Sequence, residues 1–341
     1  MTNSSKGESD KVTVVIPNWN GMQWLSGCLD SLYKQDMPHF KTVVVDNGST
    51  DGSVQFIKGN YPQVELIQLP HNAGFSSAVN IGIEKSTTQY IALLNTDTIV
   101  DKKWLSSMLD KLETAASDVA AINPKMLSMD DPNLIDDAGD ELSWYGIATK
   151  RGHNSPASYY CDEVDIFSPC GGASLYRREF LVETGGFDTA FFSYFEDVDL
   201  GLRGRLLGYR YLYIPTAMVL HKSHGSGIRN AKHVKLMTRN RLLLFLKNIP
   251  FSLLWENIFK LLYGQLYFFI AHGRHPLALL KGLWSFVLCL PEALNKRGEQ
   301  MKNLKIDRAE IRSIIHSEPP EPPLSGLIKI YFTGIFRKLI M

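Results

Sequence analysis

The 341-residue chain has few cysteines and no segment typical of a secreted protein. No C-x-x-C pair occurs among its four cysteines, Cys28, Cys161, Cys170 and Cys289. This irregular spacing excludes a disulfide scaffold and a cysteine zinc site, and it is typical of a reducing compartment. Residues 1–10 are polar, so we expect a disordered N-terminus and no secretory signal peptide.

Long apolar runs are also missing. No stretch reaches the roughly 18 uninterrupted apolar residues that indicate a membrane-spanning helix. The nearest approach, Leu277–Leu290, contains Lys281 and is followed by Pro291, which we expect to close it. The sequence therefore predicts no membrane span.

Two common nucleotide-binding motifs are absent. The chain has no G-x-x-x-x-G-K-[ST], and the glycines from Gly21 to Gly27 do not fit a dinucleotide fingerprint. A P-loop ATPase and an NAD enzyme of the Rossmann type are therefore disfavoured. His221 and His224 lie three residues apart rather than four and lack the glutamate of a zinc protease helix.

Charge is distributed unevenly along the chain. The net charge is +1, but residues 1–200 have a balance of −14 and residues 201–341 a balance of +15. An acidic half could hold a metal ion, and a basic half could meet phosphates or an anionic membrane surface. No recognised nucleic-acid-binding motif accompanies the basic half, so we predict no nucleic-acid partner.

Short Val- and Ile-rich runs alternate with helix-sized segments in the first half. The runs predicted to be strands are Val12–Ile16, Thr42–Val45, Val64–Leu69 and Tyr90–Leu94. This alternation predicts an α/β fold with a mainly parallel sheet flanked by helices. Polar clusters follow Ile16, Val45 and Leu94, at the carboxyl ends of strands, where ligands bind in open α/β sheets.

Three places in the chain carry acidic residues or a histidine with the chemistry of a catalytic site. Asp97 follows a predicted strand and offers a carboxylate to a hard divalent ion. Glu196, Asp197 and Asp199 form an acidic cluster, in which burial would raise a carboxyl pKa as a general base requires. His221 ends another apolar strand and offers an imidazole to a metal. Strand-end turns and helix N-termini also favour acidic residues, so each residue alone has a structural alternative.

Beyond residue 240 the composition becomes apolar and basic. Residues 241–317 contain helix-sized apolar runs interrupted by Lys, Gly or Pro. Residues 318–323 form a Pro-rich linker, and residues 324–341 resemble an amphipathic interfacial helix. This region could contact a membrane surface, or it could be a helical bundle packed on the first part of the chain.

Taken in order, several segments resemble family 2 glycosyltransferases over residues 11–250. They are Val14–Gly21, Val43–Ser53, Asn72–Phe75 with Asn80, Leu93–Thr98, Gly185–Asp188, Glu196–Leu200 with Arg203, and Gly208-Tyr209. The subgroup they resemble most is the bacterial rhamnosyltransferase-like enzymes of cell-surface polysaccharide assembly. The resemblance implies a GT-A catalytic domain over residues 11–240 and transfer with inversion by a single displacement.

The resemblance also implies roles for individual residues. Asp197 would be the catalytic base with Glu196 beside it, and Asp97 and His221 would hold a divalent metal, Mg²⁺ or Mn²⁺. The acceptor side would include Gly171, Gly172, Asp199 and Arg203. The nucleotide-sugar pocket would be formed by Pro17, Asn18, Asp46, Asn47, Asn72, Gly74, Asn80, Asn95 and Thr96.

One position departs from the pattern of the family. The metal motif is often Asp-x-Asp, and Asn95 occupies its first position here. An asparagine carbonyl can still bind a cation, but it contributes less charge. Weaker metal binding or a less strict metal requirement is therefore expected.

The resemblance favours a nucleotide-diphosphate sugar as donor and a saccharide or lipid-linked saccharide as acceptor. dTDP-rhamnose is the preferred donor, and UDP-sugars fit the same motifs. A non-catalytic membrane-surface or polysaccharide-binding protein is the alternative from another class. We expect a cytoplasmic enzyme that lies peripherally on the inner face of the cell membrane.

Overall fold

The computed structural model describes residues 10–223 and 231–329. Residues 1–9 of the predicted disordered segment 1–10 lie outside these ranges, and so does His224. Of the predicted amphipathic helix 324–341, only residues 324–329 are described, and they are helical. All four cysteines are described and are free thiols, as their spacing predicted.

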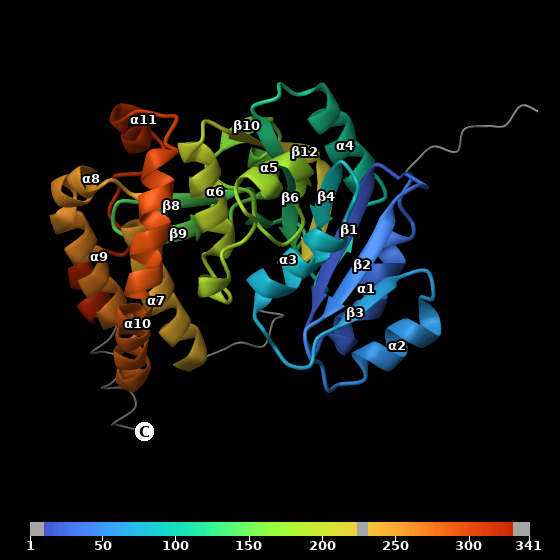
Figure 1. The fold of residues 1–341 in the computed structure, drawn as a ribbon, viewed down its shortest axis with the longest axis horizontal. Helices are drawn as coiled ribbons and strands as arrows, with labels where there is room; N and C mark the ends of the chain where they lie inside the picture. Colours follow the sequence, from blue (N-terminus) through green and yellow to red (C-terminus); the bar gives the residue numbers. More distant parts are fainter. Residues whose placement is uncertain (1–9, 224–230, 330–341) are drawn as a thin grey trace, which may run out of the picture.

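A sheet of ten strands forms the centre of the molecule, with a separate two-stranded sheet beside it (Figure 1). The strands are β1 Val12–Asn18, β2 Lys41–Asp46, β3 Glu65–Gln68, β4 Tyr90–Leu93, β5 Thr98–Val100, β6 Val119–Ser128, β7 Ile135–Asp137, β8 Asp140–Ser143, β9 Ile147–Lys150, β10 Val164–Ile166, β11 Leu175–Arg177 and β12 Arg210–His221.

The main path of the sheet is β10-β12-β6-β11-β4-β1-β2-β3. Strands β1 to β4 pair in parallel, which confirms the parallel sheet predicted for the first half. The second half is mixed, because β11 runs antiparallel to both β4 and β6. β12 is one strand with a register shift between Ile214 and Met218.

Helices cover the sheet and form a bundle beside it. They are α1 Met22–Leu32, α2 Ser53–Asn60, α3 Phe75–Lys85, α4 Trp104–Thr114, α5 Arg178–Glu183, α6 Glu196–Leu206, α7 Ala231–Asn248, α8 Phe251–Glu256, α9 Ile258–Ala271, α10 Pro276–Lys302 and α11 Arg308–Ser313. Two short 3₁₀ helices are η1 Ala157–Tyr159 and η2 Thr189–Phe191. Helices α7 to α10 lie at the end of the molecule opposite β1, β2 and β3 (Figure 1).

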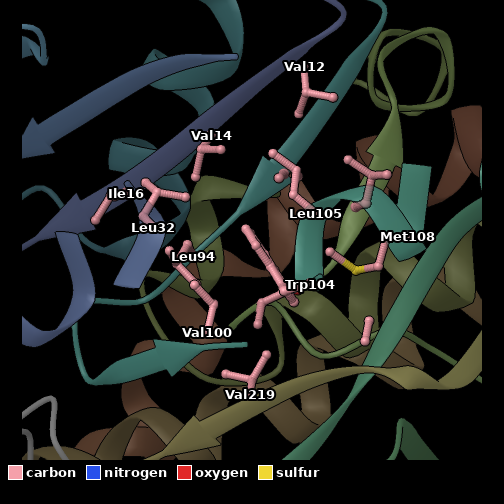
Figure 2. Close-up of a cluster of buried hydrophobic side chains, with 14 of the residues drawn as sticks. Val12, Val14, Ile16, Leu32, Leu94, Val100, Trp104, Leu105, Met108 and Val219 are labelled. Atoms are coloured by element: carbon pink, nitrogen blue, oxygen red, sulfur yellow. The ribbon is translucent and has the colours of Figure 1, made fainter. Parts of the chain in front are cut away.

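The largest core cluster lies where α1 and α4 pack on the sheet. Figure 2 shows Trp104 and Leu105 of α4 in the same cluster as Val12 and Val14 of β1, and all four side chains are buried. The indole Nε1 of Trp104 donates to the Ala173 carbonyl at 3.1 Å, so this large side chain leaves no buried donor unpaired. This core fixes the strands whose carboxyl ends form the site described below.

Helix α10 corrects the expectation that Pro291 closes an apolar run. The helix continues through Pro291 to Lys302. Pro291 and Val287 both lie on its exposed side, so solvent can reach the Val287 carbonyl that loses its intrahelical partner. Within the described ranges, α10 is the one helix long and apolar enough to cross a membrane, although no uninterrupted apolar run indicated it.

A buried ion-pair cluster joins this helical bundle to the rest of the molecule. Asp188 lies 2.6 Å from Lys247 of α7 and 2.7 Å from Lys296 of α10. Burial would raise the pKa of Asp188, but the two ammonium groups outweigh it and hold that pKa well below its usual range. Lys247 also lies 2.7 Å from Asp199 in the first turn of α6.

We expect Asp188→Asn to lower the free energy of unfolding by about 3 kcal/mol at pH 7, because it leaves Lys247 with one carboxylate partner. The folded-state pKa of Asp188 is depressed, so its contribution is complete above its ordinary pKa of about 4 and is lost as pH falls below it. Urea unfolding should therefore show a smaller gap between variant and wild type at pH 3. Asp118→Asn, which breaks the exposed pair with Arg210 at 2.7 Å, is the control and should change stability by less than about 1 kcal/mol. An equal effect of the two variants would contradict this assignment.

Candidate active site

The carboxyl ends of β1, β2 and β4 meet at one edge of the sheet, where a cleft with about 620 Å³ of empty space opens. Its lining includes seven of the predicted site residues, namely Pro17, Asn18, Asn47, Asn72, Asn95, Thr96 and Asp97. Two buried atoms of the lining, Asn18 Oδ1 and Trp24 Nε1, have no hydrogen-bond partner among the described residues. The cleft therefore holds a free acceptor and a free donor for a polar ligand.

A hydrogen bond joins Asp46 to Asn18, which lines the cleft. Asn18 Nδ2 donates to Asp46 Oδ1 at 2.8 Å, and both side chains are buried. Asp46 Oδ2 accepts from the backbone N–H of Ser49 at 3.0 Å. This contact turns the chain after β2.

Asn47 fixes the loop that leads into α3. Its Nδ2 donates to the Gly74 carbonyl at 3.0 Å, and its Oδ1 accepts from the Ala73 N–H at 2.8 Å. Gly74 has φ 96°, and a Cβ there would lie 2.7 Å from Phe192. This position therefore requires glycine, and Asn72 is held at the wall of the cleft, where its Oδ1 accepts from the Gly74 N–H at 2.9 Å.

The sheet register brings Asp97 to His221. β5 and β12 are antiparallel, and Thr98 pairs with His221. Consequently Asp97, directly before β5, lies beside the end of β12, and its Oδ1 is 3.6 Å from His221 Nε2. Two residues 124 positions apart in the sequence thus form the pair that the resemblance implied.

A third residue, which the sequence did not indicate, orients this histidine. His221 Nδ1 lies 2.7 Å from Oδ2 of Asp136 on β7. Burial lowers the pKa of His221, but the Asp136 and Asp97 carboxylates outweigh it and raise that pKa to about 9. Asp136 also binds Lys150 of β9 at 2.8 Å and the Ser223 hydroxyl.

Asp197 lies in the first turn of α6 and contacts the loop before β11. Its Oδ2 accepts from the Gly171 N–H at 3.2 Å, and its Oδ1 accepts from the Val198 N–H at 2.8 Å. The adjoining Gly172 carbonyl accepts from the Asn95 N–H at 2.8 Å, so this loop connects Asp197 to the end of β4. The cleft and the acidic cluster are therefore neighbouring parts of one site.

Burial dominates the electrostatics around Asp197. It raises the pKa of Asp197, with partial compensation from the two backbone N–H groups. The pKa of Glu196 is raised well above its usual value by burial and by the charge of Asp197. Two further buried carboxyls, Asp137 and Asp140, also have raised pKa values, and Lys150 opposes these shifts as a nearby cation. A carboxylate tuned in this way is suited to accept a proton.

Ten of the seventeen predicted site residues are not among those that line the cleft, and three of these ten, Asn80, Asp199 and Arg203, make contacts within the fold instead. Asn80 holds the backbone of Phe187, with its Nδ2 donating to the carbonyl at 2.7 Å and its Oδ1 accepting from the N–H at 2.9 Å. Asp199 is fully buried and lies 2.8 Å from Arg203. Asn80 and Arg203 line a separate, wider concavity together with Gly185 and Lys296.

Asp97 and His221 are suited to a divalent cation only together with other ligands. In residues 10–223 and 231–329, no group of three or more His, Cys, Asp or Glu side chains could hold a metal ion by itself. A carboxylate and an imidazole whose other nitrogen faces a carboxylate are nevertheless a recurrent ligand pair. Mg²⁺ is commonly bound by one or two protein groups together with substrate phosphates, so the donor set fits a metal–diphosphate site.

Comparison with known proteins shows that the chain is a glycosyltransferase and gives its family. The model of glycosyl transferase family 2 matches residues 13–185. An N-acetylglucosaminyl-diphospho-decaprenol L-rhamnosyltransferase of Mycobacterium tuberculosis is 30% identical over 255 residues, 66% of this chain and 81% of that protein. The chain therefore belongs to glycosyl transferase family 2. A pre-mycofactocin glycosyltransferase of the same organism is 28% identical and covers 64% of this chain and 44% of its own.

Solved structures show the same fold at low sequence identity. GalNAc-T7 with UDP, GalNAc and Mn²⁺ has a TM-score of 0.58 at 16% identity, covering 78% of this chain and 51% of its own. The mannosyltransferase PcManGT from Pyrobaculum calidifontis, in complex with GDP-Man and Mn²⁺, has a TM-score of 0.51 at 17% identity, covering 97% and 89%. These similarities confirm the GT-A fold expected from the sequence.

Proposed function

We propose that the enzyme transfers a sugar, preferably rhamnose from dTDP-rhamnose, to a lipid-linked saccharide with inversion at the anomeric carbon. The observation that carries this proposal is that the Asp97–His221 pair lies at one cleft and that the Gly171-Gly172 loop connects this cleft to Asp197. The preference for rhamnose rests on the L-rhamnosyltransferase relative, whose acceptor by its name is N-acetylglucosaminyl-diphospho-decaprenol. UDP-sugars remain the alternative donors.

Asp197 is the proposed catalytic base. Its carboxylate accepts the proton of the acceptor hydroxyl, the oxygen attacks the anomeric carbon, and the bond to the nucleoside diphosphate breaks. The Gly171 and Val198 N–H groups hold the carboxylate in place, so little reorganisation is needed when it takes up the proton. Buried Glu196 beside it has a pKa raised further by the Asp197 charge, which leaves the negative charge on Asp197.

Asp97 and His221 are the proposed ligands of a divalent cation, Mg²⁺ or Mn²⁺. A cation held by these two residues would supply positive charge opposite the negative charge that develops on the departing diphosphate. Asn95 lies in the same cleft and offers an uncharged oxygen where the family often has aspartate. Asn18, Asn47 and Asn72 supply amide groups for the donor on the β1 and β2 side of the cleft.

Purified enzyme should release nucleotide from its donor in a screen of dTDP-rhamnose and common UDP- and GDP-sugars, with and without Mn²⁺ or Mg²⁺. We expect turnover of one donor class, stimulated by the metal. Donor binding measured by calorimetry accompanies the screen, because a missing acceptor can silence turnover but not binding. Failure to bind any nucleotide sugar would favour a non-catalytic surface-binding protein instead.

Asp136 is expected to position His221 for the metal. In Asp136→Asn the group facing His221 Nδ1 is a neutral amide, which no longer favours a proton on that nitrogen and a lone pair on Nε2. The affinity for Mn²⁺ in the presence of nucleoside diphosphate should fall about 10–100-fold, as measured by electron paramagnetic resonance. Asp130→Asn removes an exposed carboxylate that pairs with Lys222 next to His221, and it should leave Mn²⁺ affinity unchanged. Unchanged affinity in Asp136→Asn would contradict the positioning role.

The proposed location is the inner face of the cell membrane. Two observations support it: the relative acts on a decaprenol-linked acceptor, and residues 201–341 carry a balance of +15. Basic groups next to an anionic bilayer contribute about 1 kcal/mol each.

A further inference from the structure

Helices α8, α9 and α10 expose an unusual number of large apolar side chains. On α10, Leu277, Leu280, Trp284, Val287 and Leu288 recur at helical spacing, and each is at least 47% exposed. On α8 and α9, Trp255 is 79% and Phe259 83% exposed, and Leu262 and Leu266 continue that row. α9 and α10 are in contact through buried Phe268, Ala278 and Leu279. Such an extent of exposed apolar surface indicates an interaction site.

The opposite side of α10 is fixed against α7 along much of its length. A Cβ on Gly282 would lie 2.6 Å from the Thr238 Cβ and 2.8 Å from the Lys235 carbonyl, which shows how closely the two helices approach. Nearer its C-terminal end, buried Arg297 donates to the Ile249 carbonyl at 2.7 Å. A helix attached to a folded domain along one side cannot cross a bilayer alone.

The exposed side of α10 is also not a core face. Only 22% of its most apolar 18-residue window is buried, whereas a core helix of a globular protein would be mostly covered. Attachment on one side and an apolar row on the other are the features of a helix that lies flat in a membrane interface. Trp255 and Trp284 are residues that favour this interface.

Charge identifies the partner as an anionic surface. Residues 257–291, which include all of α9 and most of α10, contain Lys260, Arg274 and Lys281 but no Asp or Glu. Arg274 and Lys281 are exposed beside the apolar rows. A second copy of the chain docked through the same face would bring like charges together, whereas anionic phospholipid would neutralise them.

We infer that the exposed rows of α8, α9 and α10 form a monotopic docking face that lies in the surface of an anionic phospholipid bilayer. This inference rests on the proposed function, since it supplies the surface on which an enzyme with a lipid-linked acceptor meets that acceptor.

Vesicle flotation of the full chain tests this docking face. The probes are phosphatidylcholine vesicles with and without phosphatidylglycerol. Leu280→Glu combined with Trp284→Glu should lower the partition coefficient at least about tenfold, because two exposed apolar groups that would enter the bilayer are replaced by charge. Lys281→Gln should lower it about fivefold on phosphatidylglycerol vesicles only. Tyr159→Glu is the control. Tyr159 is 78% exposed and lies outside helices α8, α9 and α10, so this variant should bind vesicles as the wild type does.

Release of nucleotide from the soluble donor is measured for the same variants. It should not change, because none of the substituted residues lines the cleft. Donor binding separates the two claims: failure of the wild type to bind any nucleotide sugar would count against the proposed function, not against the docking face. Equal vesicle binding by Leu280→Glu/Trp284→Glu and the wild type would overturn the inference. A wild-type dimer that ignores vesicles and becomes monomeric in the double variant would also overturn it, in favour of a second copy as the partner.

Discussion

Asp197→Asn should lower kcat for sugar transfer by about 10²–10⁴-fold, the contribution typical of a positioned general base. The amide retains the size of the carboxylate and an oxygen that can accept from Gly171, but it cannot take a proton from the acceptor hydroxyl. Donor affinity should be nearly unchanged, because Asp197 is not part of the lining of the donor cleft. Steady-state kinetics with calorimetric donor binding would separate the two effects.

The pH profile gives an independent check on this role. Burial raises the pKa of Asp197 above 3.8, so the catalytically competent ionised form is lost as pH falls through that raised value. Wild-type kcat/KM should therefore rise with pH on its acid limb, and Asp197→Asn should lack this limb. Asp165→Asn, which loses only an exposed pair with Arg210, should keep both rate and profile. A normal kcat in Asp197→Asn would show that another group accepts the proton.

Asp97→Ala should reduce metal-stimulated turnover by about 10³-fold, since stabilising the leaving diphosphate through a cation contributes several kcal/mol. It removes one of the two side chains proposed to hold the ion and leaves His221 with Asp136 alone. Mn²⁺ affinity, measured by electron paramagnetic resonance with nucleoside diphosphate present, should fall in parallel.

Asn95→Asp provides the complementary change in the same cleft. It restores the charged residue that the family often has, and it should tighten Mn²⁺ binding if Asn95 lies within reach of the ion. Metal-independent turnover in the wild type, with Asp97→Ala as active as the wild type, would contradict the metal role.

The clustering of polar residues at one edge of the sheet was predictable from the sequence for a physical reason. Strands buried on both faces are continuous Val- and Ile-rich runs, and in a parallel sheet their carboxyl ends lie at one edge. The polar residues after β1, β2 and β4 therefore had to gather, and Asn18, Asn47 and Asp97 do line one cleft.

The residues around His221 were not predictable in the same way. Asp136 and Lys150 lie on the short strands β7 and β9, within a segment whose turn-forming residues obscure any periodicity. Their proximity to His221 depends on β7 and β12 both pairing with β6, which is a matter of register across the mixed part of the sheet. The only signal was a pair of adjacent acidic residues, Asp136 and Asp137, directly before Ala138-Gly139.

The C-terminal helices show that uninterrupted apolar runs alone do not predict where a helix begins and ends. Lys281 and Pro291 interrupt the run, yet both lie on the exposed side of one continuous helix. A proline on a solvated helix face costs little when water can reach the freed carbonyl. The length of α10 therefore depends on its packing against α7, which composition does not report.

The most direct measurement is transfer from dTDP-rhamnose to an N-acetylglucosaminyl-diphospho-prenol acceptor, with the anomeric configuration of the product determined by NMR. Wild-type enzyme should form a product of inverted configuration with Mn²⁺ or Mg²⁺, and Asp197→Asn should form almost none while still binding the donor. A product that retains the anomeric configuration of the donor would contradict single displacement with Asp197 as base.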